Sequence, residues 1–439
     1  MDNSYNLKDV LKYTDIVEEQ SLVYRSIDDF ILNGRTISFN QKEIVSFASC
    51  SYLGLELDPR LKTLAAEMAL RYGTAFPTSR SYYKLQILEE LELLLEQMFE
   101  KPCIHTTTTS LGHIAALPVL IGKNDAIIYD HQVHNSVRNA FMICKGAGTY
   151  TEALRHNRMD LLEEKVVRLQ TKYDNVWFLG DGIYSMMGDA VGAEELYRLM
   201  NKYKKFRVYL DDAHGIGWCG KNGRGYVLDK IEMHPQMVMA ASLGKGFGSF
   251  GGVLVCPDAE TKRLFRKLGS TLIFSTPNMP AVLGASIASA RIHLSDEITR
   301  LQAELRSKVD LFISEVSKYD LLKNLRIDKT DSPIFFFGVG KPETGIRSLG
   351  LIVEKGFYPS LAMHPAMPVN NTGIRVTITR THTNEEIVQF AKAVNDSIIL
   401  ALAENGLSAE SIVRHFDKLL GLKSTTDNVD ETVPENIHQ

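Results

Sequence analysis

Between residues 100 and 256 the chain alternates short apolar runs with longer runs of helical spacing, and no other feature restricts its fold as much. The short runs, which predict strands, are Ala126–Tyr129, Val176–Leu179, Arg207–Leu210, Val238–Ala241 and Val253–Cys256. The helical runs are Ser110–Leu120, Asn135–Cys144, Met159–Thr171 and Ala193–Tyr203. This alternation predicts an α/β fold built on a mostly parallel sheet with helices on both faces. Ligands of such folds bind at the carboxyl ends of strands, so polar residues that follow a strand are the candidate functional residues.

The rest of the sequence predicts a lead-in and a smaller second domain. A charged helix and a strand pair around Arg35–Phe47 come first, and Ala281–Lys318 predicts a long helical stretch that leads to a C-terminal α+β domain. Its predicted elements are strands near Ile334–Val339 and Ile374–Thr379 and a helix over Asn384–Ala403. We therefore expect an N-terminal segment (1–50), a large domain (51–290), a small domain (291–420) and a polar, disordered tail (421–439).

Length and composition argue against several classes of protein. A chain of 439 residues has room for two or three domains. Its net charge of −4 gives no electrostatic reason to expect nucleic acid or an anionic membrane as partner. No apolar run reaches the roughly 18 residues of a membrane span, and we expect no secretory signal. Five scattered cysteines without a CxxC pair, and histidines without an HExxH pattern, argue against disulfides and metal catalysis and favour a cytoplasmic location.

One lysine, Lys245, lies in a glycine-rich stretch between two predicted strands. The stretch Ser242–Gly252 contains five glycines. Small residues allow a flat ligand to approach the backbone, and burial lowers the pKa of a lysine and makes its amine nucleophilic. Lys245 is therefore a candidate for Schiff-base chemistry, and a glycine-rich hairpin with a solvent-facing lysine is the alternative.

Titratable residues also follow two of the predicted strands. Asp211 and His214 come after Arg207–Leu210, where a carboxylate can pair with a cationic ring nitrogen and the histidine can reach another part of the same ligand. His134 follows Ala126–Tyr129 and can stack on an aromatic ligand. Capping of a turn or of a helix start is the alternative role for these residues.

Hydroxyl groups and one arginine complete the set of candidates. The segment His105–His113 begins a predicted helix, and hydroxyls with free N–H groups at a helix N-terminus suit a phosphate. Simple N-capping explains the same residues. Arg375 lies in an apolar strand, where it needs an anionic partner. A substrate carboxylate and a structural salt bridge both meet that need.

Taken in order, these motifs resemble those of one family. They are a hydroxyl-rich helix start, His134-x-Ser136, Asp181-Gly-Ile-Tyr-Ser185, Asp211-Asp-Ala-His214-Gly, Ser242-x-x-Lys245, Phe274-Ser275-Thr276 and Arg375. The series resembles the α-oxoamine synthase family of fold-type I pyridoxal-phosphate enzymes, from about Phe47 to Asn395. The aspartate–histidine and lysine motifs are specific in combination, although each is weak alone.

The resemblance implies a role for each candidate. Lys245 would carry the cofactor, pyridoxal 5′-phosphate, as a Schiff base, and Asp211 would pair with its ring nitrogen. His214 would contact the phenolic oxygen of the ring, and His134 would stack on its face. The other expected cofactor-binding residues are Thr106, Thr107, Thr108, Ser110, Ser185, Ser242, Ser275 and Thr276. Either of the last two would reach the phosphate of the neighbouring subunit, in a homodimer with shared active sites.

The resemblance also implies a reaction. An amino acid bound through its carboxylate to Arg375 would lose its Cα proton to Lys245, and the cationic ring would delocalise the carbanion. The carbanion would attack an acyl thioester of coenzyme A or of an acyl carrier protein and expel the thiol. The resulting β-keto acid would lose CO2 and leave an α-amino ketone. Two alternatives are a fold-type I aminotransferase that uses no thioester and a non-catalytic partner subunit of a synthase heterodimer.

Two segments depart from the family pattern. Cys50 stands where the family has an asparagine that binds the substrate carboxylate, and residues 78–86 lack the family's glycines and histidine. A thiol cannot offer the two donors of an amide. We therefore expect Cys50, Arg80 and Arg375 to bind the substrate. Either Arg80 or another group compensates for the missing amide, or the amino acid is held differently. The departures favour a specialised lipid or metabolite pathway.

Overall fold

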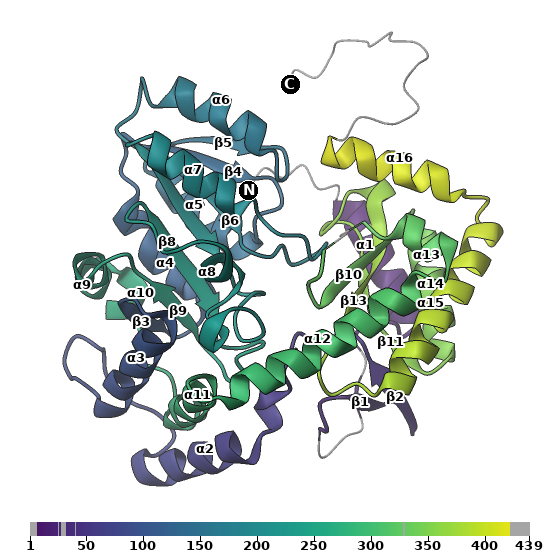
Figure 1. Ribbon diagram of the computed structural model, residues 1–439, viewed down its shortest axis with the longest axis horizontal. Coiled ribbons are helices and arrows are strands. Elements are labelled where there is room, and N and C mark those ends of the chain that lie inside the picture. The colour runs from purple at the N-terminus through teal and green to yellow at the C-terminus, as the bar shows by residue number, and fades with distance from the viewer. Residues whose placement is uncertain (1–6, 25, 28–31, 40, 328–329, 422–439) are drawn as a thin grey trace.

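The computed structural model describes residues 7–24, 26–27, 32–39, 41–327 and 330–421. Two α/β bodies lie side by side, and the helix α12 (Glu297–Val316) runs from one to the other (Figure 1). The larger body contains a seven-stranded sheet, and the smaller body contains both ends of the described chain. The predicted tail falls, beyond residue 421, outside the described residues.

The seven-stranded sheet has the strand order β3-β9-β8-β7-β6-β4-β5. Its strands are β3 (Cys103–Thr106), β4 (Ala126–Asp130), β5 (Tyr150–Leu154), β6 (Val176–Asp181), β7 (Phe206–Asp211), β8 (Met237–Ser242) and β9 (Gly252–Val255). Strands β5, β4, β6, β7 and β8 pair in parallel, and β9 is antiparallel to both β8 and β3. The predicted, mostly parallel sheet is confirmed.

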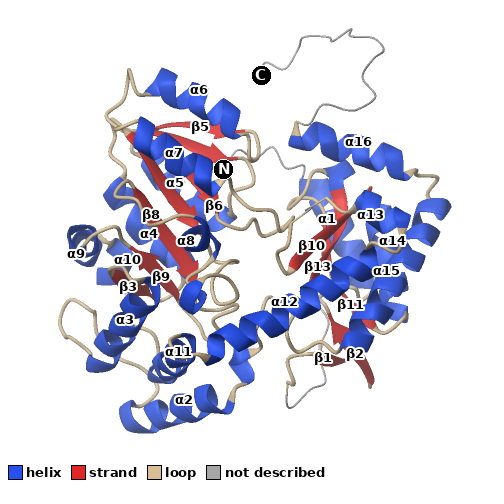
Figure 2. Cartoon of the chain, viewed as in Figure 1, coloured by secondary structure: helices blue, strands red, loops and turns tan. Residues whose placement is uncertain are grey.

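Helices cover both faces of this sheet (Figure 2). Ile127 of β4 packs in one apolar cluster with Phe141 of α5, whereas the next residue, Ile128, packs in another with Leu196 of α7. Burial on both faces explains why the strands are continuous apolar runs without polar alternation. The helices of this body are α2 (Pro59–Tyr72), α3 (Gln86–Phe99), α4 (Thr109–Leu120), α5 (Asn135–Gly146), α6 (Met159–Leu169), α7 (Ala193–Lys202), α8 (Tyr226–Lys230), α9 (Ala259–Leu268), α10 (Ser270–Ile273) and α11 (Pro280–His293).

The small body combines the C-terminal part of the chain with the N-terminal segment. One sheet has the order β10-β13-β12 and the other the order β1-β2-β11, so the predicted N-terminal strand pair is extended by a C-terminal strand. The strands are β1 (Thr36–Phe39), β2 (Lys42–Ser46), β10 (Ile334–Gly340), β11 (Phe357–Tyr358), β12 (Ser360–Ala362) and β13 (Thr372–Thr377). The helices are α1 (Leu7–Glu19), α13 (Asp320–Leu325), α14 (Pro342–Glu354), α15 (Asn384–Glu404) and α16 (Ala409–Leu420).

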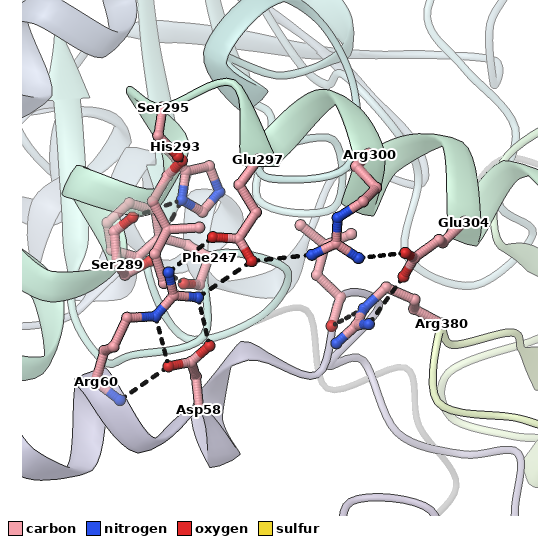
Figure 3. A network of polar contacts seen from close by, with 12 residues as sticks. Asp58, Arg60, Phe247, Ser289, His293, Ser295, Glu297, Arg300, Glu304 and Arg380 are labelled. Atoms are coloured by element: carbon pink, nitrogen blue, oxygen red, sulfur yellow. Dashed lines mark hydrogen bonds and ion pairs between the residues drawn. The ribbon is translucent and has the colours of Figure 1, made fainter.

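The predicted helical stretch Ala281–Lys318 consists of two helices with a short break between them. Helix α11 ends at His293 and α12 begins at Glu297. The hydroxyl of Ser295 donates to the carbonyl oxygen of Ile292 at 2.7 Å, which satisfies one of the last carbonyls of α11 (Figure 3). Apolar spacing continues on both sides of this short break, so periodicity alone does not reveal it. Among the described residues, no helix combines the length and apolar character needed to cross a membrane.

Candidate active site

A cavity of about 320 Å³ opens at the carboxyl ends of β6, β7 and β8. Its walls also include the N-terminal ends of α4 and α5 and the glycine-rich connection between β8 and β9. The predicted site residues that line it are Thr108, Ser110, His134, Asp211, His214, Ser242 and Lys245. Residues separated by more than 130 positions thus meet where the α/β fold predicts a ligand.

Lys245 lies on a hairpin connection and faces the cavity. Its Nζ is 2.8 Å from His214 Nε2. A Cβ on Gly248, which has a φ of +83°, would lie 2.4 Å from the Cβ of Leu55, so this glycine allows the connection to pack against the segment that follows β2. Burial lowers the pKa of Lys245, while the charge of Asp211 acts in the opposite direction. The result is an amine that loses its proton more readily than an exposed lysine.

Asp211 is the last residue of β7 and is almost fully buried. Its Oδ2 is 3.0 Å from His113 Nε2, and His113 Nδ1 is 2.7 Å from the hydroxyl of Tyr209. Burial alone would raise the pKa of Asp211, but the charge and hydrogen bond of His113 outweigh it and lower that pKa to about 2. Asp211 is therefore ionised at neutral pH and suits a cationic ring nitrogen.

His134 caps the N-terminus of α5. Its Nδ1 is 2.6 Å from the hydroxyl of Ser136, and its backbone N–H donates to Asp181 Oδ1 at 3.1 Å. Burial lowers the pKa of His134, which keeps the ring neutral. Asp181 ends β6 in register with Asp211 at the end of β7, and burial together with the Asp211 charge raises the pKa of Asp181 well above its usual range.

The start of α4 provides free backbone donors at the cavity. Thr108 is the N-cap and accepts from the Leu111 N–H at 3.1 Å. A Cβ on Gly252 would lie 2.7 Å from the backbone nitrogen of Thr109, so the glycine brings β9 close to this helix start. Ser242 also lines the cavity, and its Oγ accepts from the Gly244 N–H at 3.2 Å, so the hydroxyl hydrogen can be donated to a ligand. These donors and the helix dipole suit a phosphate group.

In the part of the chain that the structure describes, the other predicted hydroxyl residues do not line the cavity. The Thr106 hydroxyl donates to the Thr108 carbonyl at 2.9 Å, and the Thr107 hydroxyl donates to the Thr276 carbonyl at 3.3 Å. The hydroxyl of Ser275 donates to the carbonyl of Thr271. The proposed contact of Ser275 or Thr276 with a neighbouring subunit stays a prediction.

Arg375 and Cys50 meet at the junction of the two bodies. Arg375 Nε donates to the carbonyl oxygen of Ser185 at 2.6 Å, and its Nη2 is 3.7 Å from Cys50 Sγ. Ser185 therefore contacts Arg375 through its backbone. Among the described residues no carboxylate pairs with Arg375, although its side chain is largely buried.

Arg80 contacts neither Cys50 nor Arg375 among the described residues, and its substrate-binding role stays a prediction. One of its guanidinium nitrogens lies 2.7 Å from Glu92 Oε1 and the other donates to the carbonyl of His105. Glu92 also pairs with Lys262 and Arg266. Among the described residues, the buried glutamate of α3 is thus the anion that pairs with Arg80.

Sequence reasoning assigned no role to two residues that contact the predicted ones. His113 pairs with Asp211, and it lies four positions after Thr109, so helical spacing places both on one face of α4. The hydroxyl of Tyr52 is 2.7 Å from His214 Nδ1. The two residues are 162 positions apart, and no local pattern predicts their contact.

Comparison with known proteins gives a consistent result. Residues 42–394 match the family model described as aminotransferase class I and II. An 8-amino-7-oxononanoate synthase of Thermoanaerobacter pseudethanolicus is 28% identical over 80% of this chain and 87% of its own. A serine palmitoyltransferase of Bacteriovorax stolpii is 26% identical over 83% of this chain and 84% of its own.

A solved structure confirms the predicted fold-type I architecture. A serine palmitoyltransferase from S. paucimobilis with a bound PLP–myriocin aldimine matches with a TM-score of 0.81, over 92% of this chain and 100% of the other, at 19% identity. The predicted resemblance is confirmed by these relatives, and pyridoxal phosphate is the cofactor of the family. Because the family model covers most of its length, the chain belongs to the aminotransferase class I and II family.

Proposed function

We propose that this chain is a pyridoxal-phosphate-dependent acyltransferase that condenses an amino acid with an acyl thioester, with loss of CO2, to give an α-amino ketone. The observation that carries the proposal is the meeting of Lys245, His214 and Asp211 in one cavity. The relatives named 8-amino-7-oxononanoate synthase and serine palmitoyltransferase support this class of reaction.

The cavity fits the cofactor chemically. The start of α4 and Ser242 offer donors for a phosphate, the ionised Asp211 faces the cavity, and Lys245 supplies the amine. When bound, pyridoxal phosphate supplies a cationic ring that takes up the electrons of a carbanion. The phosphate end and the carboxylate end of the cavity thus match the two ends of the cofactor.

The protein's own residues would handle the proton and the substrate. A lysine whose pKa is lowered can accept the Cα proton of the amino acid, and His214 holds Nζ in place. Arg375 would bind the substrate carboxylate, since no described side chain neutralises it and the Ser185 carbonyl orients its guanidinium. Cys50 would lie beside that carboxylate and favour an amino acid bound differently from those of the housekeeping enzymes, in a specialised lipid or metabolite pathway.

A homodimer would complete the site. Phe250 lines the cavity and is half exposed, and Phe274 is 86% exposed beside the predicted partner-contacting Ser275. Met279 and Tyr82 are exposed as well. Exposed large apolar side chains, of which Phe250 lines the cavity, favour a covering protein surface, and a second copy of the chain is the occupant we propose.

The test is a spectral and turnover assay of the purified protein. We expect a Schiff-base absorbance band with pyridoxal phosphate that Lys245→Ala abolishes, together with at least about a 1,000-fold loss of turnover. A panel of glycine, alanine, serine and cysteate with several acyl thioesters should release CO2 and free thiol. Release of a keto acid without thiol would instead identify an aminotransferase, and a protein without the band would be a non-catalytic partner subunit.

A further inference from the structure

The imidazole of His214 lies between a phenol and an amine, both of which face its ring nitrogens. Its Nδ1 is 2.7 Å from the Tyr52 hydroxyl, and its Nε2 is 2.8 Å from Lys245 Nζ. Tyr52 is fully buried. A neutral imidazole carries one hydrogen on its two ring nitrogens. The position of that hydrogen decides whether His214 donates to Tyr52 or to Lys245.

The surroundings of the Tyr52 hydroxyl determine where its own hydrogen points. Burial raises the pKa of Tyr52 well above its usual value, so the phenol keeps its hydrogen. Among the described residues, Cys50 and Arg375 also act on the pKa of this hydroxyl. A guanidinium can only donate and a thiol is a weak acceptor, so His214 Nδ1 is the good acceptor in reach.

His214 is itself neutral. Burial, followed by the charges of Lys245 and Arg375, lowers the pKa of His214 well below its usual value, and His134 adds to the same effect. An Nδ1 that accepts from Tyr52 carries no hydrogen. The single hydrogen of the ring must therefore be on Nε2, the nitrogen beside Lys245.

We propose that Tyr52 is a positioning residue whose hydroxyl donates to His214 Nδ1 and thereby fixes the tautomer that carries its hydrogen on Nε2, directed at Lys245 Nζ. Such an N–H needs a lone pair to donate to, so it favours the neutral amine of Lys245 over the ammonium form. The value of that neutral amine rests on the proposed function, whereas the tautomer rests on the contacts of Tyr52 and His214 alone.

The backbone holds Tyr52 in this position from the side of the small body. Tyr52 has a φ of +53°, which a non-glycine residue adopts only when its surroundings impose it. The Arg380 N–H donates to the Tyr52 carbonyl at 2.7 Å, and Arg380 Nε donates to the Leu53 carbonyl at 2.8 Å. The same guanidinium pairs with Glu304 of α12 at 3.0 Å (Figure 3). Tyr52 is thus held in place both through its backbone and through its hydroxyl.

The test uses the full chain labelled with ¹⁵N-histidine, measured as purified and again after removal of bound cofactor. His214→Asn identifies the His214 signals. We expect one neutral tautomer with the hydrogen on Nε2 over about pH 6 to 8. In Tyr52→Phe we expect the Nδ1-protonated tautomer to appear, since the phenol no longer occupies Nδ1. Wild-type protein with the hydrogen on Nδ1, or an unchanged tautomer in Tyr52→Phe, would overturn the proposal.

Tyr184→Phe is the matched control. Tyr184 is fully buried, and among the described residues its hydroxyl has no hydrogen-bond partner, so its removal should leave the His214 signals unchanged. In turnover, Tyr52→Phe should lower kcat by at least about tenfold and change the amino-acid KM by less than about threefold. An equal loss in both tyrosine variants would indicate a general packing effect and reject the role of the Tyr52 hydroxyl. The tautomer is measured on protein without cofactor, so this measurement does not depend on the proposed reaction. If the proposed reaction fails, the role of Tyr52 can still be confirmed or rejected.

Discussion

Two polar networks in this protein contain similar charged groups, but one is buried and the other is exposed to solvent. The Asp211 cluster consists of Asp211, His113 and Tyr209, and the side chains of its ion pair are 4% and 0% exposed. The hinge network joins α2, α12 and the segment after β13 through Asp58, Arg60, Glu297, Arg300, Glu304 and Arg380 (Figure 3). Its arginines are 26% to 59% exposed.

The two networks show that the effect of a charged group on stability or ionisation depends on its burial, and not on the number of ion pairs. Water screens the hinge network, where each exposed pair contributes roughly 0 to 1 kcal/mol. In the Asp211 cluster the same kind of pair holds a buried carboxylate ionised, with its pKa lowered to about 2. We therefore expect the functional penalty of a substitution to follow burial.

The largest effect should come from Asp211→Asn. The amide removes the charge that would stabilise a cationic ring nitrogen while it keeps the shape of the side chain, so we expect turnover to fall by at least about 100-fold. Steady-state kinetics of the cofactor-loaded variant measure this loss. Activity within tenfold of wild type would contradict the role of Asp211 and weaken the contrast between the two networks.

Asp212 supplies the control at the next position. It is also fully buried, but burial raises the pKa of Asp212 to about 8, so it is mostly protonated at neutral pH. Its Oδ2 accepts from the Val227 N–H at 3.0 Å, which an amide oxygen can replace. We expect Asp212→Asn to change stability by less than about 1 kcal/mol and to retain activity.

A second buried cluster, in which His156 contacts two aspartates, tests the same contrast through the pH dependence of stability. His156 Nδ1 is 2.8 Å from Asp130 Oδ1, and its Nε2 is 2.8 Å from Asp189 Oδ2. Burial alone would lower the pKa of His156, but the two carboxylates outweigh it and raise that pKa to about 10. Since the folded-state pKa is raised, this stabilisation is fully present below the unfolded pKa of about 6.5 and is lost as pH rises through about 10.

His156→Gln should therefore lower the free energy of unfolding by about 3 kcal/mol near pH 7. The difference from wild type should shrink as pH approaches about 10, because wild-type His156 then loses its own charge. Denaturant titrations at several pH values measure both. A difference that does not depend on pH would mean that packing, and not the imidazolium, accounts for the loss.

The sequence predicts the large-body half of the site better than the junction with the small body. Lys245, Asp211 and His134 each follow a strand whose apolar run is visible in the sequence. The expectation that ligands bind at the carboxyl ends of strands therefore places these residues in the cavity. Cys50 and Arg375 were both predicted, and the structure brings them together across 325 positions. That contact depends on the pairing of the N-terminal segment with the small body, which no local pattern encodes.

The contacts that the sequence does not predict have the same physical origin. Arg80 pairs with Glu92, 12 positions further along the chain, and no local pattern predicts that pair. The break between α11 and α12 depends on a side-chain bond of Ser295, and the contact of Tyr52 with His214 depends on a strained turn held by Arg380. Local spacing predicts elements, whereas tertiary partners decide which polar groups are already satisfied.

The hinge network should give the smallest effects, and its members should differ. Arg300 is 59% exposed and touches only Glu297 and Glu304 among the described partners, so Arg300→Gln should cost less than about 0.5 kcal/mol and become neutral in about 0.5 M salt. Arg380→Gln also removes the bond to the Leu53 carbonyl, so it should cost about 1 kcal/mol in any salt. Denaturant unfolding of both variants at low and high salt measures these losses of stability. Equal, salt-sensitive losses in the two variants would show that the Leu53 bond adds nothing to the screened ion pairs.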